Sequence, residues 1–223
     1  MTADRTVRGV LFDLDGTLVD NMRHHSVAWL EIARTLGATL TPEQVMRDFA
    51  GRRNEEILPI VAGRALTPAE VAQLAEQKEA RYRELYAPDL QLIAGADALL
   101  AQLAARGIAA GVASAAPRKN RDFVLDGLGL RARLQAVVGG DEVARGKPAP
   151  DLFLEGARRL GVAPADILVF EDARLGVLAA RAAGMRVCGI TTGEPAAELI
   201  DAGALAACAD FRELPEPIQR LLG

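Results

Sequence analysis

Residues 9–18 read Gly-Val-Leu-Phe-Asp-Leu-Asp-Gly-Thr-Leu, an apolar run that ends in two acids and a glycine. The apolar part begins at Val7 and predicts a strand buried on both faces, because a parallel strand covered by helices on both sides is apolar throughout. Asp13 and Asp15 are two residues apart, so their side chains point the same way where the strand stops. Open parallel sheets bind ligands at that edge. The sequence therefore predicts two carboxylates at a ligand-binding edge.

Three later segments also place polar residues where an apolar run or a turn ends. They are Ser114 after residues 108–113, Lys147 between a glycine and a proline, and the pair Glu171 and Asp172 after residues 167–170. Taken singly, each is ordinary, because a Ser between a strand and a helix is usually an N-cap and a lone Lys is usually a solvated charge. The glycine and the proline define the backbone at Lys147, which favours an ammonium group aimed in one direction.

In this order, the four segments resemble the four motifs of the haloacid dehalogenase superfamily. In the phosphatases of that superfamily the first acid is the nucleophile and the second is the general acid and base, roles that the resemblance gives to Asp13 and Asp15. The hydroxyl of Ser114 and the backbone N–H groups that follow it, beginning at Ala115, are implied to hold the phosphoryl group. Lys147, in a Gly-Lys-Pro-x-Pro segment, is implied to pair with the nucleophile and with the phosphoryl oxygens.

The resemblance also implies a magnesium ion at these acids. A carboxylate is a poor nucleophile toward a phosphate ester that already carries negative charge, so the site must first offset charge. Mg²⁺ prefers octahedral oxygen ligands from carboxylates, phosphate and water. Its expected ligands are Asp13, the backbone carbonyl of Asp15, Asp172 and, directly or through water, Glu171. Attack by Asp13 then gives an aspartyl phosphate, and Asp15 exchanges a proton with the leaving oxygen and later with water.

About a hundred residues separate the first two motifs, far more than one strand-helix-strand crossover requires. Thr-Pro pairs at residues 41–42 and 67–68 are typical of helix starts. An all-helical insert at this point resembles the C1-type cap of subfamily I in the superfamily. We therefore expect an α/β protein with a Rossmann-like parallel-sheet core, residues 1–20 and 89–223, and a helical cap domain, residues 21–88.

The rest of the chain alternates between strand and helix patterns. The expected strands after the first are residues 108–113, 136–138, 167–170 and 186–190. The expected helices are residues 26–36 in the insert and residues 95–106, 122–128, 151–160 and 175–183 in the core.

The insert resembles the branch of the superfamily that contains β-phosphoglucomutase and small sugar-phosphate phosphatases. In that branch a His four residues before a Trp faces the site, and a Lys and a Tyr four residues apart share one helix face, with the Lys reaching the substrate. Residues 51–55 resemble the specificity loop of these caps, whose arginines grip a distal phosphate or hydroxyl groups; one of the two arginines here is expected to be a surface charge. The resemblance assigns substrate contacts to His25, Arg52, Arg53, Asn54, Lys78, Ser114 and Ala115.

The same comparison separates two reactions. A phosphosugar mutase must bind two phosphate groups and shield its aspartyl phosphate from water, and the mutases of this branch use an Arg in the cap loop and a Ser and an Asn after the second motif. In an ungapped alignment with those mutases, the three positions hold Asn54, Ala116 and Arg118 in this chain. We therefore expect a phosphatase acting on a small phosphorylated metabolite such as a sugar phosphate.

Other functions stay open as alternatives. A mutase is the first of them, because an arginine at position 52, 53 or 118 can supply the positive charge that a second phosphate group needs. Hydrolysis of a phosphonate or pyrophosphate substrate is the next alternative. A non-enzymatic phosphoaccepting signalling module is more distant, since such modules carry no cap and hold their acidic pair on a different strand from the phosphoaccepting Asp.

Composition excludes several other classes of protein. The chain has 223 residues, half of them hydrophobic, and a net charge of −4, which gives no basic footprint for nucleic acid. No apolar run approaches the roughly 18 residues that a membrane span needs, and residues 1–5 carry no secretory signal. Cys188 and Cys208 are expected to be buried apolar side chains. We expect a cytoplasmic enzyme, a monomer or weak dimer, whose partner is a small-molecule phosphate ester and neither nucleic acid nor membrane.

Overall fold

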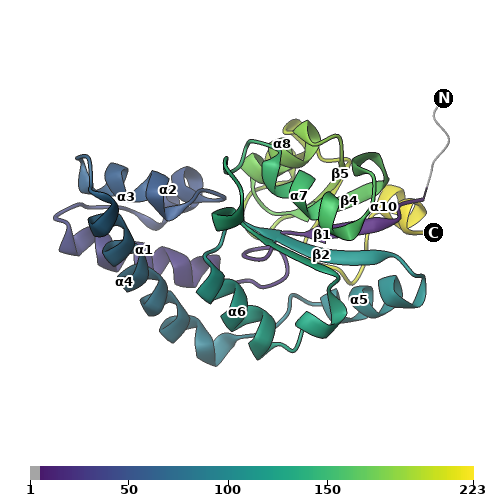
Figure 1. Cartoon of the computed structure of the whole chain (residues 1–223), viewed down its shortest axis with the longest axis horizontal. Helices are drawn as coiled ribbons and strands as arrows, with labels where there is room; N and C mark the ends of the chain where they lie inside the picture. Colours follow the sequence, from purple (N-terminus) through teal and green to yellow (C-terminus); the bar gives the residue numbers. More distant parts are fainter. Residues whose placement is uncertain (1–5) are drawn as a thin grey trace.

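The computed structural model describes residues 6–223, so the expectation for residues 1–5 lies outside the described range. Within that range, six parallel strands form one sheet in the order β3-β2-β1-β4-β5-β6 (Figure 1). Strand β1 (Gly9–Phe12) lies at the centre and pairs with β2 and β4, which explains why it is apolar throughout. The predicted fold class, a Rossmann-like parallel sheet with a helical insert, is confirmed.

The other strands are β2 (Ala109–Ser114), β3 (Ala136–Gly139), β4 (Ile167–Glu171), β5 (Arg186–Ile190) and β6 (Ala206–Cys208). Strands β2 to β5 lie within one residue of their predicted bounds. Strand β6 was not predicted, because its three small residues are only half-buried at the edge of the sheet and carry little apolar signal. Cys188 on β5 is buried and Cys208 on β6 is half-buried.

Helices cover both faces of the sheet. They are α5 (Ala96–Ala105), α6 (Arg118–Gly127), α7 (Asp151–Leu160), α8 (Arg174–Ala182), α9 (Ala196–Asp201) and α10 (Glu216–Leu222), with short 3-10 turns at η1 (Ala87–Asp89), η2 (Arg131–Arg133), η3 (Gly140–Glu142) and η4 (Pro164–Asp166). Val10 and Phe12 of β1 pack on the α5 side, and Leu11 packs on the α7 and α8 side, as alternation along a strand requires.

Helix α6 begins four residues before the predicted start at residue 122. Pro117 precedes it with an extended backbone, and the first turn carries Asn120 and Arg121, which are buried by polar contacts and give no apolar pattern. The prediction was wrong there because polar residues that become buried look like surface residues in the sequence.

The insert between β1 and β2 is helical. It contains α1 (Met22–Thr35), α2 (Pro42–Phe49), α3 (Asn54–Ala62) and α4 (Pro68–Tyr86), which lie together on the left of Figure 1, beside the sheet. Thr41 and Thr67 cap α2 and α4 through capping boxes, so the helix starts predicted from the Thr-Pro pairs are confirmed. Helix α3 carries no such start signal and was not predicted.

Helix α4 joins the insert to the core. Trp29, Ile57 and Leu58 belong to an apolar cluster inside the insert, whereas Tyr82 and Tyr86 at the end of α4 belong to the cluster that covers the sheet. The two parts therefore share one continuous helix, and the division at residues 21–88 stays a prediction. Within residues 6–223 no helix is long and apolar enough to cross a membrane.

Candidate active site

The residues of the four sequence motifs meet at the carboxyl edge of the sheet. Asp13 follows the last residue of β1, while Ser114 and Glu171 are the last residues of β2 and β4. Because the three strands are parallel neighbours, their ends lie side by side. Asp172 comes next in the chain, and Lys147 reaches the same place from the loop before α7. All five side chains are buried.

Lys147 connects two of these acids. Its Nζ donates to Asp13 Oδ1 at 2.7 Å and also to Glu171 Oε1. Burial lowers the pKa of the Lys147 ammonium, but the charges of Asp13 and Glu171 raise it more, so the net pKa lies above its ordinary value. The ammonium is therefore charged and held in place.

The carboxylates outnumber this single cation. Burial raises the pKa of Asp13 to about 7; Lys147 opposes that rise, and the neighbouring Glu171 and Asp15 add to it. Burial also raises the pKa of Asp172, and the charges of Glu171 and Asp13 raise it further. The site as built holds more negative charge than Lys147 offsets, which is the situation that a bound divalent cation relieves.

The oxygen atoms at this edge suit magnesium. Asp172 sits in a cradle of small residues, since a Cβ on Gly16 or on Gly193 would overlap its carboxylate, and Thr17 Oγ1 donates to its Oδ1 at 3.3 Å. Within residues 6–223 no three His, Cys, Asp or Glu side chains form a metal site by themselves. Mg²⁺ does not need such a cage, because it takes one or two carboxylates and completes its shell with water and phosphate. Asp13 and Asp172 fit that pattern.

Glu171 has a different set of contacts. Its Oε1 accepts from Lys147, its Oε2 accepts from the backbone N–H of Ala173 at 2.9 Å, and its side chain is fully buried. The structure thus shows Glu171 as a support for Lys147, and its role as a metal ligand stays a prediction.

Asp15 is held from two sides. Asn21 Nδ2 donates to Asp15 Oδ1 at 2.6 Å, and His25 Nε2 lies 3.6 Å from Asp15 Oδ2, longer than a hydrogen bond. Burial raises the pKa of Asp15, but His25, Asn21 and Lys78 together lower it more, so that the net pKa falls below its ordinary value. Without substrate, Asp15 is therefore ionised.

The support from Asn21 was missed in the sequence. Asn21 is fully buried; its Nδ2 also lies 2.6 Å from the Tyr82 hydroxyl, and its Oδ1 accepts from the backbone N–H of Gly16 at 3.2 Å. An Asn that precedes a helix is usually read as a cap, but here its side chain makes no cap hydrogen bond. In the sequence, only the position of Asn21 six residues after Asp15 could have pointed to this contact.

Two predicted cap residues lie together behind Asp15. Lys78 Nζ lies 2.8 Å from His25 Nδ1 and 4.8 Å from the centre of the Trp29 ring. The His25 ring stacks on Tyr82 with 3.7 Å between ring centres. Lys78 Nζ lies 5.9 Å from the centre of the same Tyr82 ring, so Lys78 and Tyr82 share one helix face, as their spacing predicts. Both His25 and Lys78 are buried and line one cavity with Asp13 and Asp15.

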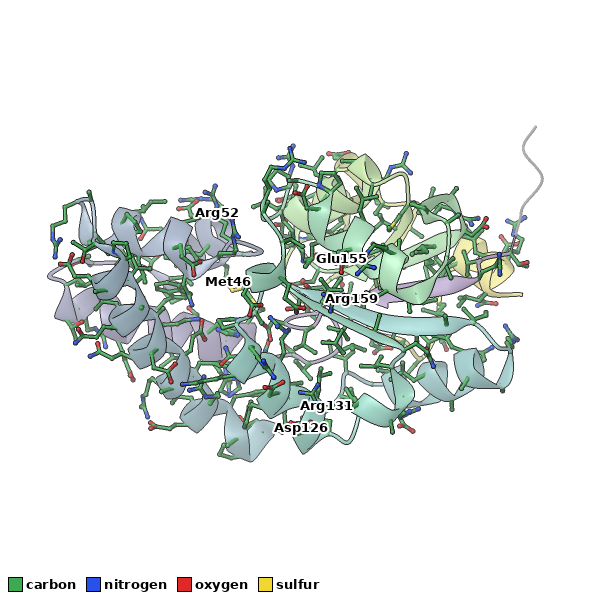
Figure 2. The ribbon with its side chains drawn as sticks, in the orientation of Figure 1. Met46, Arg52, Asp126, Arg131, Glu155 and Arg159 are labelled. Atoms are coloured by element: carbon green, nitrogen blue, oxygen red, sulfur yellow. The ribbon has the colours of Figure 1, made fainter. Side chains whose placement is uncertain are left out.

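That cavity lies between the cap and the sheet and is lined by every predicted site residue except Arg53. Arg52 lines it from the loop before α3, and Figure 2 shows Arg52 on the core-facing side of the cap. Arg53 instead donates from Nη1 to the carbonyl of Gly140 at 3.3 Å and pairs with Glu56 outside the cavity. Of the two arginines, Arg52 is thus the one that reaches the cavity.

The second motif supplies a polar wall. Ser114 Oγ accepts from the backbone N–H of Ala116 at 3.1 Å, and both Ala115 and Ala116 line the cavity. Arg118, which would have to replace a phosphate-binding Asn in a mutase, has an 80% exposed side chain and pairs with Asp122 at 3.6 Å. It therefore does not compensate for the missing polar side chain at Ala116.

Glu79 is a second residue that sequence reasoning missed. It follows Lys78 on α4, lines the cavity and is buried. In the sequence it is one of several glutamates on a charged helix, and nothing in the pattern separates it from Glu76 or Glu84, which are exposed. Its Oε2 accepts from Asn120 Nδ2 of α6, so the contact joins residues 41 positions apart.

Comparison with known proteins agrees with this geometry. Residues 7–184 match the family described as haloacid dehalogenase-like hydrolase. The chain is 34% identical to validoxylamine A 7'-phosphate phosphatase of Streptomyces hygroscopicus subsp. limoneus over 201 residues, 87% of this chain and 91% of that protein. It is 33% identical to β-phosphoglucomutase of Bacillus subtilis over 196 residues, 85% of each chain.

A solved structure agrees as well. The crystal structure of a haloacid dehalogenase hydrolase of family IA, variant 3, from Entamoeba histolytica superposes with a TM-score of 0.86 at 28% identity, covering 96% of this chain and 97% of that one. With four motifs in order, a parallel sheet and a helical cap, the chain belongs to the haloacid dehalogenase-like hydrolases, in the branch that includes β-phosphoglucomutase and sugar-phosphate phosphatases.

Proposed function

We propose that this hydrolase is a magnesium-dependent phosphatase that removes the phosphate group from a small phosphorylated metabolite, such as a sugar phosphate, through an aspartyl phosphate on Asp13. The observation that carries the proposal is the contact of 2.7 Å between Lys147 Nζ and Asp13 Oδ1 at the base of a cavity covered by the helical cap. A nucleophilic carboxylate needs a fixed cation beside it when it attacks an anion. The phosphatase named above supports the substrate class.

The residues of the chain divide the work of phosphoryl transfer. Bound Mg²⁺, held by Asp13, Asp172 and the backbone carbonyl of Asp15, would offset the charge of the phosphate oxygens. Lys147 steadies Asp13 and pairs with the same oxygens, while the hydroxyl of Ser114 and the backbone N–H groups after β2 hold the phosphoryl group as its charge redistributes. Asp13 attacks phosphorus, and the ester oxygen leaves.

Asp15 handles the proton. It is ionised in the empty site, and the negative charge of an arriving phosphate ester raises its pKa toward protonation. The protonated carboxyl gives its proton to the leaving oxygen and then, as a carboxylate, takes one from the water that hydrolyses the aspartyl phosphate. Asn21 and His25 keep its carboxyl group aimed at the cavity during both steps.

A phosphosugar mutase is the second candidate, favoured by the similarity to a β-phosphoglucomutase. Three features support hydrolysis instead. Ala116 offers no side-chain hydrogen bond, Arg118 is exposed, and the amide of Asn54 is engaged by Glu79 at 2.8 Å. These are the positions at which a mutase would hold a second phosphate group.

Two assays on the purified protein test the proposal. Phosphate release is measured on a panel of phosphorylated sugars, polyols and organic acids with Mg²⁺, and glucose 6-phosphate formation from β-glucose 1-phosphate is followed by a coupled assay. Release from at least one metabolite at kcat/KM above about 10⁴ M⁻¹s⁻¹ supports a phosphatase. Glucose 6-phosphate formation that exceeds phosphate release would instead establish the mutase.

A further inference from the structure

The cap end of the cavity holds a carboxylate that the chemistry on Asp13 does not use. Glu79 lines the cavity from α4 with its side chain 5% exposed. Its Oε1 accepts from Asn54 Nδ2 at 2.8 Å and from Lys78 Nζ at 3.0 Å, and its Oε2 accepts from Asn120 Nδ2 at 2.6 Å. Three donors from three different elements are thus arranged around one carboxylate, which a surface glutamate does not have.

These contacts keep Glu79 charged. Burial raises the pKa of its carboxyl group, but the charges of Lys78 and His25 lower it more, and the amide hydrogen bonds add to that effect. The carboxylate in turn offsets the charge of Lys78, which approaches the cavity from the same helix. The Lys78 ammonium is thereby less available to an anion.

The other cations on this side are offset too. Arg83 Nη2 lies 3.1 Å and Lys119 Nζ lies 3.0 Å from the Glu76 carboxylate. Asn120 of α6 donates to Glu79 and accepts from Arg83 Nη1 at 2.7 Å, so both ends of its amide are engaged. Each of these cations is already paired with a carboxylate, with which an arriving phosphate group would have to compete.

Arg52 lines a different side of the cavity. It lies on the loop before α3 and also lines a second hollow with Lys147 and Leu175 of the core. Arg52 is exposed, so that water screens its charge. Lys78 and Glu79 form the α4 wall of the cavity, and together with the adjacent His25 they determine its buried electrostatic environment.

We propose that Glu79 makes the α4 wall a site for neutral hydroxyl groups and excludes a second phosphate group. The inference rests on the proposed phosphatase function and specifies its substrate class: monophosphates of sugars or polyols whose far end carries free hydroxyls. A carboxylate has about four acceptor positions, so a substrate hydroxyl can donate to Glu79 beside the three protein donors. A second phosphate would instead bring negative charge against a buried negative group, and repulsion of that kind rejects the wrong ligand.

Competition experiments test this assignment. Inhibition constants against p-nitrophenyl phosphate hydrolysis, with Mg²⁺, are measured for two matched pairs: fructose 1-phosphate with fructose 1,6-bisphosphate, and glucose 1-phosphate with glucose 1,6-bisphosphate. In the wild type each monophosphate binds more tightly than its bisphosphate. Glu79→Gln removes the charge, keeps the size and frees the ammonium of Lys78. In this variant we expect the inhibition constant of the bisphosphate to fall at least tenfold relative to that of its monophosphate.

Two further variants make the result specific. Glu84→Gln removes the same charge from an exposed position on the same helix, and should leave the ratio of inhibition constants unchanged. The double variant Glu79→Gln with Lys78→Gln should lose the gain, because the freed ammonium is its source. A general loss of folding weakens both ligands together and does not produce a selective gain.

Each outcome has one meaning. Bisphosphates that bind the wild type as tightly as the monophosphates overturn the assignment, and so does an unchanged ratio in Glu79→Gln. If Glu79→Gln fails to fold, the comparison of ligands in the wild type can still overturn the assignment. Absence of phosphate release from every ester overturns the proposed function itself, and calorimetric binding of the same pairs then tests Glu79 separately.

Discussion

At the scale of single residues, the site is organised by a few polar side chains that each have several partners. Lys147 contacts Asp13 after β1 and Glu171 at the end of β4. Asn21 contacts Asp15, Tyr82 and the turn at Gly16. Removing one such side chain leaves more than one buried polar group without its partner, and that is costly. The catalytic and the structural roles of these residues must therefore be separated by experiment.

The substitution Asp13→Asn separates the catalytic role of the expected nucleophile from its structural role. The change is nearly isosteric, and because burial raises the pKa of Asp13 to about 7, the fold gains little from its charge. We expect thermal stability to be kept and turnover to fall below about 1% of the wild type, a barrier increase of at least 2.7 kcal/mol. Phosphate release and thermal melting measure both quantities. Asp201→Asn on α9 is the matched control, and turnover above that level in a fully stable Asp13→Asn protein would disprove the role of Asp13.

Asn21→Ala tests a residue that the sequence did not single out. It removes the hydrogen-bond partner of Asp15 Oδ1 and of the Tyr82 hydroxyl, while the Gly16 amide keeps the Val19 carbonyl at 2.8 Å. We therefore expect a loss of about 1–3 kcal/mol in the free energy of unfolding and a lower kcat. Urea denaturation measures the loss. In a double-mutant cycle with Tyr82→Phe the two changes should not add, because they remove a shared contact of 2.6 Å. Full additivity would show that the contact contributes nothing.

At the scale of elements, α4 does two things along its length. Its N-terminal half belongs to the cap and starts at the capping box of Thr67, while its last turns pack on the sheet through Tyr82 and Tyr86. Lys78 lies between these two parts and faces the cavity. A helix that is anchored in the core holds such a side chain at a fixed distance from the catalytic acids, as specificity requires.

Specificity should therefore depend on the cap more than on the sheet. We expect Lys78→Ala and His25→Ala each to lower kcat/KM for the best metabolite by about tenfold or more, which is about 1.4 kcal/mol. Hydrolysis of p-nitrophenyl phosphate should change far less, since its leaving group offers the cap little to hold and hardly needs Asp15 as an acid. Equal losses on both substrates would indicate a structural role, and no loss on either would mean that these side chains do not contact substrate.

At the scale of the whole molecule, the parallel sheet brings acids from distant segments to one edge, and the charge that collects there has a consequence. Asp13, Glu171 and Asp172 share one ammonium group, and burial together with the charges of Glu171 and Asp13 holds the pKa of Asp172 above its ordinary value. We expect activity to require Mg²⁺ and to be lost with excess chelator, and Mg²⁺ to raise the melting temperature. Undiminished phosphate release in chelator would contradict the site.

Calcium provides a sharper version of the same test. Its larger radius and looser coordination allow a carboxylate to bind with both oxygens, which would misalign Asp13 for attack. We expect calcium to inhibit in competition with magnesium while it still raises the melting temperature, so that binding and activity separate. Activation by calcium equal to that by magnesium would contradict this account of Asp13.

The sequence by itself determined five of the six strands of the sheet, the starts of α2 and α4 in the cap, and the edge at which the four motifs meet. Those features are local. An apolar run predicts a buried strand, and Thr-Pro pairs predict helix starts. A polar residue that directly follows an apolar run must lie at the end of the strand that the run forms. Strands β2 to β5 lie within a residue of their predicted bounds for that reason.

Only the tertiary structure decided which polar residues of the cap line the cavity and which residue of the core supports them. Glu79 and Asn120 look like surface residues in the sequence and are buried because each meets the other across 41 positions, and Arg52 differs from Arg53 only in the direction that the loop before α3 gives it. Burial of a charged or amide group is favourable only where partners surround it, and those partners come from distant segments. No local pattern carries that information, so the wall that faces the substrate became visible only after the chain was folded.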